Sequence, residues 1–174
     1  MKLFKPDYYV KNFDCVCIER LKNRGIKVLL CDIDNTLVAY DEVKPSERVL
    51  QFFHRVESNG IKVALCSNAP KERATRFSAD LPGIQTYWFS CKPFPFCFWK
   101  VKREFHVQAK EIALIGDQIY TDILGGNFSG LYTILSDPIA IKDRKITKIF
   151  RVFEKLVYYH LKKRNELNRG EYDD

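Results

Sequence analysis

The feature that most constrains the fold is a regular alternation of short apolar runs with amphipathic stretches, which begins after the first 25 residues. The apolar runs predict buried strands, and the stretches between them carry apolar side chains at helical spacing. The predicted strands occupy residues 28–31, 61–66, 84–89, 112–115 and 131–135. The predicted helices begin at residues 45, 71, 95, 120 and 145. This pattern predicts an α/β fold in which a central parallel sheet of about five strands is flanked by helices.

The length of 174 residues suits one well-packed domain and is short for two. Because no linker, repeat or change in composition divides the chain, we expect a single domain over residues 1–174. We distinguish a basic N-terminal segment (1–25), a core (26–141), and a basic C-terminal helix and tail (142–174) whose last ten residues we expect to be frayed. The longest aliphatic or aromatic runs have four residues, which excludes a membrane-spanning helix of about 20 apolar residues.

The net charge of +7 lies at the two ends of the chain. Residues 1–30 and 142–174 each carry a net charge of +4, and the centre carries −1. Such ends are either solvated helix faces or a surface for an anionic partner, which would be lipid or nucleic acid. The start of the chain lacks the apolar core of a secretory signal, and none of the six cysteines forms a CxxC pair. We therefore expect a cytoplasmic protein without disulfides or a zinc site, peripheral at the inner face of the membrane if its partner is lipid.

Polar residues gather where four of the predicted strands end, and the carboxyl ends of parallel strands are where such sheets bind ligands. Strand by strand, these residues are Asp32, Asp34, Asn35 and Thr36; Ser67 and Asn68; Lys92; and Asp117 with Asp122. Asp32 and Asp34 point to the same side of an extended segment, so their carboxylates repel each other. With Asp117 as a third oxygen donor, a divalent cation such as Mg²⁺ would offset this repulsion and leave room for a phosphate oxygen.

The order of these residues resembles the four motifs of the haloacid dehalogenase (HAD) superfamily of phosphatases. The motifs are the run Asp-x-Asp-x-Thr at 32–36, Ser67, Lys92, and Gly-Asp at 116–117 with Asp122 after it. The neighbouring loops and the run Lys-Pro-Asp-Tyr-Tyr near the N-terminus are similar to the class IIIA, YqeG-like subfamily. The resemblance implies a HAD-like Rossmannoid fold with no cap or a minimal one.

The resemblance also implies the roles of the acidic residues. Asp32 would be the nucleophile that forms an aspartyl-phosphate, and Asp34 the general acid and base. A Mg²⁺ ion would be held by the carboxylates of Asp32 and Asp117 and by the backbone carbonyl of Asp34.

The remaining motif residues would bind phosphate or support the loops. By the same resemblance, Ser67, Asn68 and Lys92 would hold the phosphoryl oxygens, where hydrogen bonds and positive charge stabilise the transition state. Asn35, Thr36 and Asp122 would be supporting residues, and Asp122 would act either near the metal or by orienting Lys92.

Resemblance to the YqeG-like subfamily and its mitochondrial relatives implies hydrolysis of phosphatidylglycerophosphate to phosphatidylglycerol. One alternative keeps the chemistry and replaces the lipid by a soluble phosphate ester or a phosphoprotein. A second alternative is a non-catalytic module that binds RNA or ribosomes through the basic ends, although the chain has no RNA-binding signature or zinc finger. The sequence does not indicate an oligomeric state.

Three further features bear on the site. The Gly-Gly pair at 125–126 lacks the Lys and Ser/Thr of a phosphate loop, so we expect it to permit close packing or to end a helix. Seven aromatic residues within 87–99 form either a wall for a lipid-like substrate or ordinary core packing. Because the loop at 38–45 has only eight residues and the interval 68–92 already holds a helix and a strand, we expect an open site without a lid.

Overall fold

The sheet has six parallel strands in the order β1-β6-β5-β2-β3-β4. The computed structural model describes residues 2–140 and 145–173, with side chains described for 2–140 and 153–173. The strands are β1 (Tyr8–Val10), β2 (Val28–Cys31), β3 (Lys62–Cys66), β4 (Gln85–Tyr87), β5 (Ile112–Gly116) and β6 (Tyr132–Ser136). The predicted α/β architecture is confirmed. Strands β3 and β5 lie on opposite sides of β2, which creates a switch point at the carboxyl end of β2.

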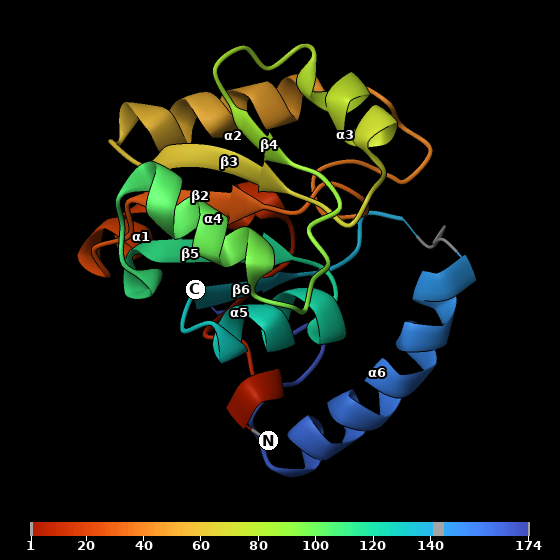
Figure 1. Cartoon of the computed structure of the whole chain (residues 1–174). Helices are drawn as coiled ribbons and strands as arrows, with labels where there is room; N and C mark the ends of the chain where they lie inside the picture. The colour runs from red at the N-terminus through yellow and green to blue at the C-terminus, as the bar shows by residue number, and fades with distance from the viewer. Residues whose placement is uncertain (1, 141–144, 174) are drawn as a thin grey trace.

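Helices cover both faces of the sheet (Figure 1). They are α1 (Ile18–Asn23), α2 (Glu47–Ser58), α3 (Lys71–Ser78), α4 (Phe96–Phe105), α5 (Leu124–Phe128) and α6 (Lys145–Lys163). Short 3-10 turns η1 (Lys2–Phe4), η2 (Phe13–Cys15) and η3 (Ala109–Glu111) and a π turn η4 (Ile119–Ile123) complete the chain. Side chains alternate along β2, so Leu29 and Cys31 pack under α1, α2 and α3, whereas Val28 and Leu30 pack under α4.

The N-terminal segment contributes a strand that the sequence analysis did not predict. Strand β1 pairs with β6, with Tyr8 opposite Ile134 and Val10 opposite Ser136, so the sheet has six strands where about five were expected. All three residues of β1 are buried. A strand of three residues buried on both faces shows no alternation of apolar and polar side chains, which is why the sequence pattern did not reveal it.

The C-terminal tail is ordered along the free edge of β1, and the prediction that the last ten residues are frayed is wrong. The backbone N–H of Asp173 donates to the carbonyl of Tyr9 at 2.8 Å. In return, the carboxylate of Asp173 accepts the N–H of Tyr9 at 2.8 Å, and the hydroxyl of Tyr172 donates to Asp137. The tail therefore satisfies backbone groups that an open sheet edge would leave to solvent or to another chain.

Helix α6 buries only part of the apolar face that its sequence predicts, in which Ile146, Ile149, Phe150, Phe153, Leu156, Val157 and Leu161 recur at three- and four-residue intervals. Val157 and Leu161 are buried, but Phe153 and Leu156 are more than half exposed. The other predicted members of that face, Ile146, Ile149 and Phe150, lie outside the described side chains. The buried carboxylate of Glu154 accepts the backbone N–H of Ile119 at 2.7 Å and so anchors α6 to η4. Glu154 therefore shares the packed face of α6 with Val157 and Leu161.

No helix in the described part of the chain is both long and apolar enough to cross a bilayer.

Candidate active site

The predicted site residues meet at the switch point of the sheet. Asp32 directly follows β2, and its backbone N–H continues the ladder by donating to Ile115 at 2.9 Å. Ser67 follows β3 in the same way and donates to Tyr87 at 2.9 Å, and Asp117 follows β5. Because each residue is one position past a paired strand, the sheet itself fixes the distances between them. The polar residues that follow these strands in the sequence therefore lie together at the carboxyl end of the sheet.

Lys92 lies at the centre of this group with an almost fully buried side chain. Its Nζ donates to Asp32 Oδ1 at 2.7 Å, to Asp122 Oδ1 at 2.6 Å and to the carbonyl of Cys66 at 2.8 Å. These acceptors use all three protons of the ammonium group. Burial alone lowers the pKa of Lys92, but the carboxylates of Asp122 and Asp32 outweigh it, so the pKa is raised well above its ordinary value. Lys92 therefore stays charged beside the acidic residues.

The loop that carries Lys92 is held to the end of β3 by Asn68. The side-chain oxygen of Asn68 accepts the backbone N–H of Lys92 at 2.8 Å, and its amide nitrogen donates to the Lys92 carbonyl at 2.9 Å. A further bond joins the N–H of Ser90 to the carbonyl of Ser67 at 3.1 Å, and the Lys92–Pro93 peptide bond is cis. These bonds position Lys92, and the predicted contact of Asn68 with phosphate stays a prediction.

Three buried carboxylates could hold a metal ion. Oxygen atoms of Asp32, Asp117 and Asp122 all lie within 4.8 Å of one another. Three anionic oxygen donors beside a single lysine suit a hard divalent cation such as Mg²⁺. The oxygens of Asp122 already accept bonds from Lys92, from the N–H of Gln118 and from Thr121. Asp32 and Asp117 are therefore the better placed ligands, and Asp122 orients Lys92, which is one of the two roles predicted for it.

The charge state of Asp32 depends on its surroundings. Burial raises the pKa of Asp32 to about 7, Lys92 opposes this rise, and the nearby Asp122 carboxylate adds to it. The hydroxyl of Thr36 lies between two carboxylates, 3.3 Å from Asp32 Oδ2 and 3.4 Å from Asp117 Oδ1. A cation bound between these carboxylates would favour the ionised form of Asp32, which is the form a nucleophile needs.

Asp34 lies at the mouth of the site and pairs with an arginine that the sequence analysis did not single out. Its carboxylate is 3.1 Å from the guanidinium of Arg73, with 17% and 14% of the two side chains exposed. Asn35 has a left-handed backbone, with φ of 63°, and donates its N–H to Val38 at 2.7 Å, which turns the chain so that Asp34 faces α3. The one available signal for Arg73 was that α3 begins shortly after Ser67, so its first turn must lie beside the site.

Two glycines allow the elements around Lys92 to approach closely. A Cβ at Gly125 would lie 2.8 Å from Pro93 Cα and 2.9 Å from its carbonyl oxygen, and a Cβ at Gly116 would overlap the side chain of Asp122. Gly126 packs in the same way against Thr133. The expected close packing at 125–126 is confirmed, and part of it is against the loop that carries Lys92.

We expect Gly125→Ala to lower both stability and turnover. The added methyl group must push the backbone of Pro93, so overpacking should cost about 1 to 3 kcal/mol, and the displaced loop should move Lys92 from Asp32. Thermal unfolding and kcat check this. Gly126→Ala is the control, because its methyl group meets side chains away from that loop and should lower the melting temperature without a matching loss of kcat. An unchanged kcat in Gly125→Ala would contradict the expectation.

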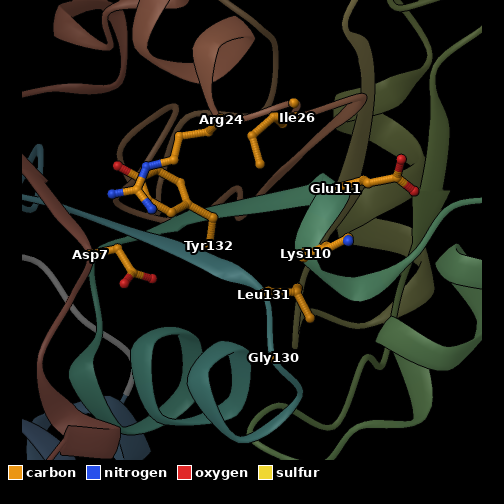
Figure 2. Close-up of a pocket in the computed structure, with 9 residues that line it drawn as sticks. Asp7, Arg24, Ile26, Lys110, Glu111, Gly130, Leu131 and Tyr132 are labelled. Atoms are coloured by element: carbon orange, nitrogen blue, oxygen red, sulfur yellow. The ribbon is translucent and has the colours of Figure 1, made fainter.

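A separate cavity at the other end of the sheet lacks a buried lysine in contact with a cluster of buried carboxylates. This cavity of about 450 Å³ lies at the amino ends of β5 and β6, where Tyr132, Arg24 and Asp7 line one side and Lys110 and Glu111 the other (Figure 2). Its basic and acidic side chains are mixed, and the predicted site residues all lie at the carboxyl ends of the strands. The carboxyl end of the sheet is therefore the candidate active site.

The sequence pattern of the haloacid dehalogenase-like hydrolases matches residues 16–130, which include every residue described at the carboxyl end of the sheet. The chain belongs to this family. Among its HAD relatives, the probable phosphatase YqeG of Bacillus subtilis is 36% identical over 166 residues, with 95% of this chain and 96% of that protein covered.

Two further comparisons extend this result. The mitochondrial phosphatidylglycerophosphatase GEP4 of Saccharomyces cerevisiae is 27% identical over 173 residues, covering 91% of this chain and 90% of that protein. An uncharacterised protein from Listeria monocytogenes has a similar fold, with a TM-score of 0.57, 19% identity, and coverage of 69% of this chain and 84% of its own. The predicted HAD-like fold is confirmed.

Proposed function

We propose that this chain is a Mg²⁺-dependent phosphomonoester hydrolase that converts phosphatidylglycerophosphate to phosphatidylglycerol through an aspartyl-phosphate at Asp32. The observation that carries the proposal is the buried contact of Lys92 with Asp32 and Asp122, which places one ammonium group and several carboxylates where a phosphate monoester would react. We also propose that the whole chain, residues 1–174, acts as one HAD domain.

The reaction has two steps that these residues can perform. Asp32 attacks phosphorus, the bond to the glycerol oxygen breaks, and Asp34 supplies the proton that the leaving oxygen needs. Water then attacks the aspartyl-phosphate, Asp34 takes a proton from it, and phosphate and the free Asp32 carboxylate are regenerated. The positive charge of Lys92 and the hydroxyl group of Ser67 stabilise the phosphoryl oxygens in both steps. A Mg²⁺ ion held by Asp32 and Asp117 would supply positive charge to the same oxygens.

The lipid substrate is supported by the relatives and by the open edge of the site. A similar protein that covers most of this chain is called a phosphatidylglycerophosphatase. Residues 38–45 form a short loop in which Tyr40 and Val43 are exposed, and no inserted domain lies over the site in the described part of the chain. An open site suits a phosphate presented by a large body such as a membrane, because the substrate itself can exclude water.

The same open site also admits a soluble phosphate ester or a phosphoprotein. Phosphate release from a panel of phospholipids, sugar phosphates, nucleotides and phosphopeptides, each with and without Mg²⁺, separates these substrates. We expect the highest kcat/KM on phosphatidylglycerophosphate and loss of release without Mg²⁺. A soluble ester turned over much faster than the lipid would contradict the proposal. The RNA-binding alternative has less support, because the buried carboxylates of this chain would have no role in binding RNA.

Replacing Asp117 by Asn should raise the Mg²⁺ concentration needed for half-maximal activity by about tenfold or more, which corresponds to about 1.4 kcal/mol, because the site loses an anionic oxygen ligand. Activity titrated against Mg²⁺ measures this shift, and wild-type protein treated with a chelator should lose phosphate release until Mg²⁺ is restored. An Asp117→Asn variant with an unchanged Mg²⁺ requirement would show that the ion is held elsewhere.

The basic C-terminal helix supports a peripheral position at the inner face of the membrane. We expect binding to anionic vesicles that falls sharply between about 0.05 and 0.3 M salt, where the Debye length passes through about 10 Å. Lys148, Arg151 and Lys155 recur at three- and four-residue intervals, which predicts a basic row on this helix; Lys155 is exposed, and the side chains of the other two lie outside those that the structure describes. Each of these basic side chains would contribute about 1 kcal/mol to the free energy of binding to an anionic membrane surface.

Changing these three residues to Glu should weaken vesicle binding and lipid turnover but leave a soluble ester unaffected. The charge-matched control changes Lys22, Lys62 and Lys110 to Glu, because these lysines lie at the other end of the sheet. Equal losses on both substrates would mean that the helix is structural and does not dock on membranes.

A further inference from the structure

An exposed aromatic surface surrounds the loop that carries Lys92. We call it the aromatic rim, and it consists of Trp88, Phe89, Phe94, Phe96 and Trp99. These side chains are 44% to 64% exposed. Seven phenylalanine and tryptophan side chains are exposed in the described part of the chain, and five of them belong to the rim. The sequence left open whether this segment is core or surface, and for these five residues the structure places it on the surface.

The rim is a continuous surface with a fixed shape. The rings of Phe94 and Phe96 are 6.2 Å apart, and those of Phe96 and Trp99 are 5.8 Å apart in an edge-to-face contact. Phe96 also lines a groove of about 260 Å³ together with Trp88 and Phe89. Contiguous exposed apolar side chains of this kind mark a binding surface rather than ordinary surface scatter.

The backbone holds the rim against the active site. Phe89 has a left-handed conformation, with φ of 46°, which is uncommon for a bulky residue, and its N–H donates to the carbonyl of Ala69 at 3.1 Å. Phe94 is two residues past Lys92, so their Cα atoms are at most about 7 Å apart. The rim therefore lies between the end of β4 and the first turns of α4, on both sides of Lys92 in the sequence.

The charges around the rim match an anionic partner. No acidic residue occurs between Asp80 and Glu104. Lys71 places its ammonium group 5.2 Å from the ring of Trp88, and Lys100 lies 5.4 Å from the ring of Tyr87. Tryptophan and phenylalanine bordered by lysine is the composition that proteins use at the interface between lipid and water.

We propose that the aromatic rim inserts into the surface of an anionic phospholipid bilayer and so presents the lipid phosphate to Asp32. This inference rests on the proposed action on a membrane lipid. Asp32 and Lys92 are each only 5% exposed, so the lipid phosphate has to come close to the protein surface that carries the Lys92 loop. The acyl chains of such a substrate stay in the bilayer, which brings the exposed rim on this loop to the level of the headgroups. A second copy of this chain seated on the rim would instead keep this surface away from the bilayer.

The chain contains two tryptophans, and both belong to the rim, so tryptophan fluorescence, excited selectively over that of the nine tyrosines, reports on this surface alone. We expect a blue shift when unlabelled protein is mixed with vesicles of phosphatidylglycerol and phosphatidylcholine, and quenching when the phosphatidylcholine carries brominated acyl chains. Vesicles of phosphatidylcholine alone should give much smaller changes. Absence of both changes at vesicle concentrations that bind the protein would overturn the proposal. A blue shift that depends on protein concentration without vesicles would also overturn it, because a second copy would then cover the rim.

A variant with Phe94→Ser and Phe96→Ser keeps both tryptophans as reporters. We expect its affinity for the anionic vesicles to fall by about tenfold or more, because each ring loses burial in the interface. Turnover of vesicle lipid should fall in parallel, while turnover of a soluble phosphate ester should be unchanged. Phe128→Ser is the matched control, since Phe128 is 68% exposed and lies outside the rim, and it should bind vesicles as the wild type does. Equal vesicle binding by the double variant and the wild type would overturn the proposal.

The two proposals fail in different ways. Insertion of the tryptophans without hydrolysis of phosphatidylglycerophosphate would support the rim and refute the proposed substrate. Hydrolysis of that lipid in vesicles without any change in tryptophan fluorescence would support the substrate and refute the rim.

Discussion

Asp32→Asn is expected to abolish phosphate release, with a loss of at least about 10³-fold, because an amide cannot attack phosphorus as the carboxylate does. The fold should survive. Burial raises the pKa of Asp32 to about 7, which means that the charged form is costly in this environment, and a neutral side chain of the same shape removes that cost. Lys92 keeps its contacts with Asp122 and the carbonyl of Cys66. Phosphate release measured beside thermal unfolding checks both expectations.

The control for this variant is Asp80→Asn, which changes the same chemical group at an exposed position beside Lys44. Its turnover should equal that of the wild type. If Asp32→Asn retained wild-type turnover, Asp32 would not be the nucleophile and the proposed mechanism would fail.

Asp34→Asn should lose the general acid and base, which contributes about 10² to 10⁴-fold. The loss should depend on the leaving group, because an alcohol needs a proton as it departs and an acidic phenol does not. We therefore expect the full loss on an alkyl phosphate and a smaller loss in the first step on an aryl phosphate, measured as the single-turnover rate of alcohol or phenol release. Arg73 offers a comparison, since Arg73→Gln removes the partner of Asp34 and retains its carboxylate.

Equal losses on the two esters would contradict a proton-transfer role for Asp34. They would indicate instead that the side chain shapes the loop between Asn35 and Val38, where the backbone turns back toward β2.

Much of the fold could be predicted because it is encoded locally. Helix α3 begins at the predicted residue, and the strands from β2 to β6 lie within two residues of the predicted bounds at each end. Apolar runs of this length and amphipathic segments between them leave few other arrangements. Asp32, Ser67 and Asp117 followed from the same logic, because the end of a parallel strand fixes where the next residue lies.

The features that were not predicted depend on contacts between distant parts of the chain. The pairing of β1 with β6 and the bond from Asp173 to Tyr9 each join segments that are far apart in the sequence. No sequence spacing indicates the pairing of Arg73 with Asp34, and the two hydrogen bonds between Asn68 and the backbone of Lys92 form only in the folded loop. Sequence periodicity describes single elements and carries no information about such pairs.

Transfer of phosphate from a phospholipid to Asp32 can be trapped directly. The protein is mixed with vesicles that contain phosphatidylglycerophosphate labelled in its terminal phosphate, and the reaction is stopped in acid before turnover is complete. We expect label bound covalently to the peptide that contains Asp32 in the presence of Mg²⁺, and no label in Asp32→Asn. Release of labelled phosphate from the lipid with no labelled protein, or with label on another peptide, would contradict it.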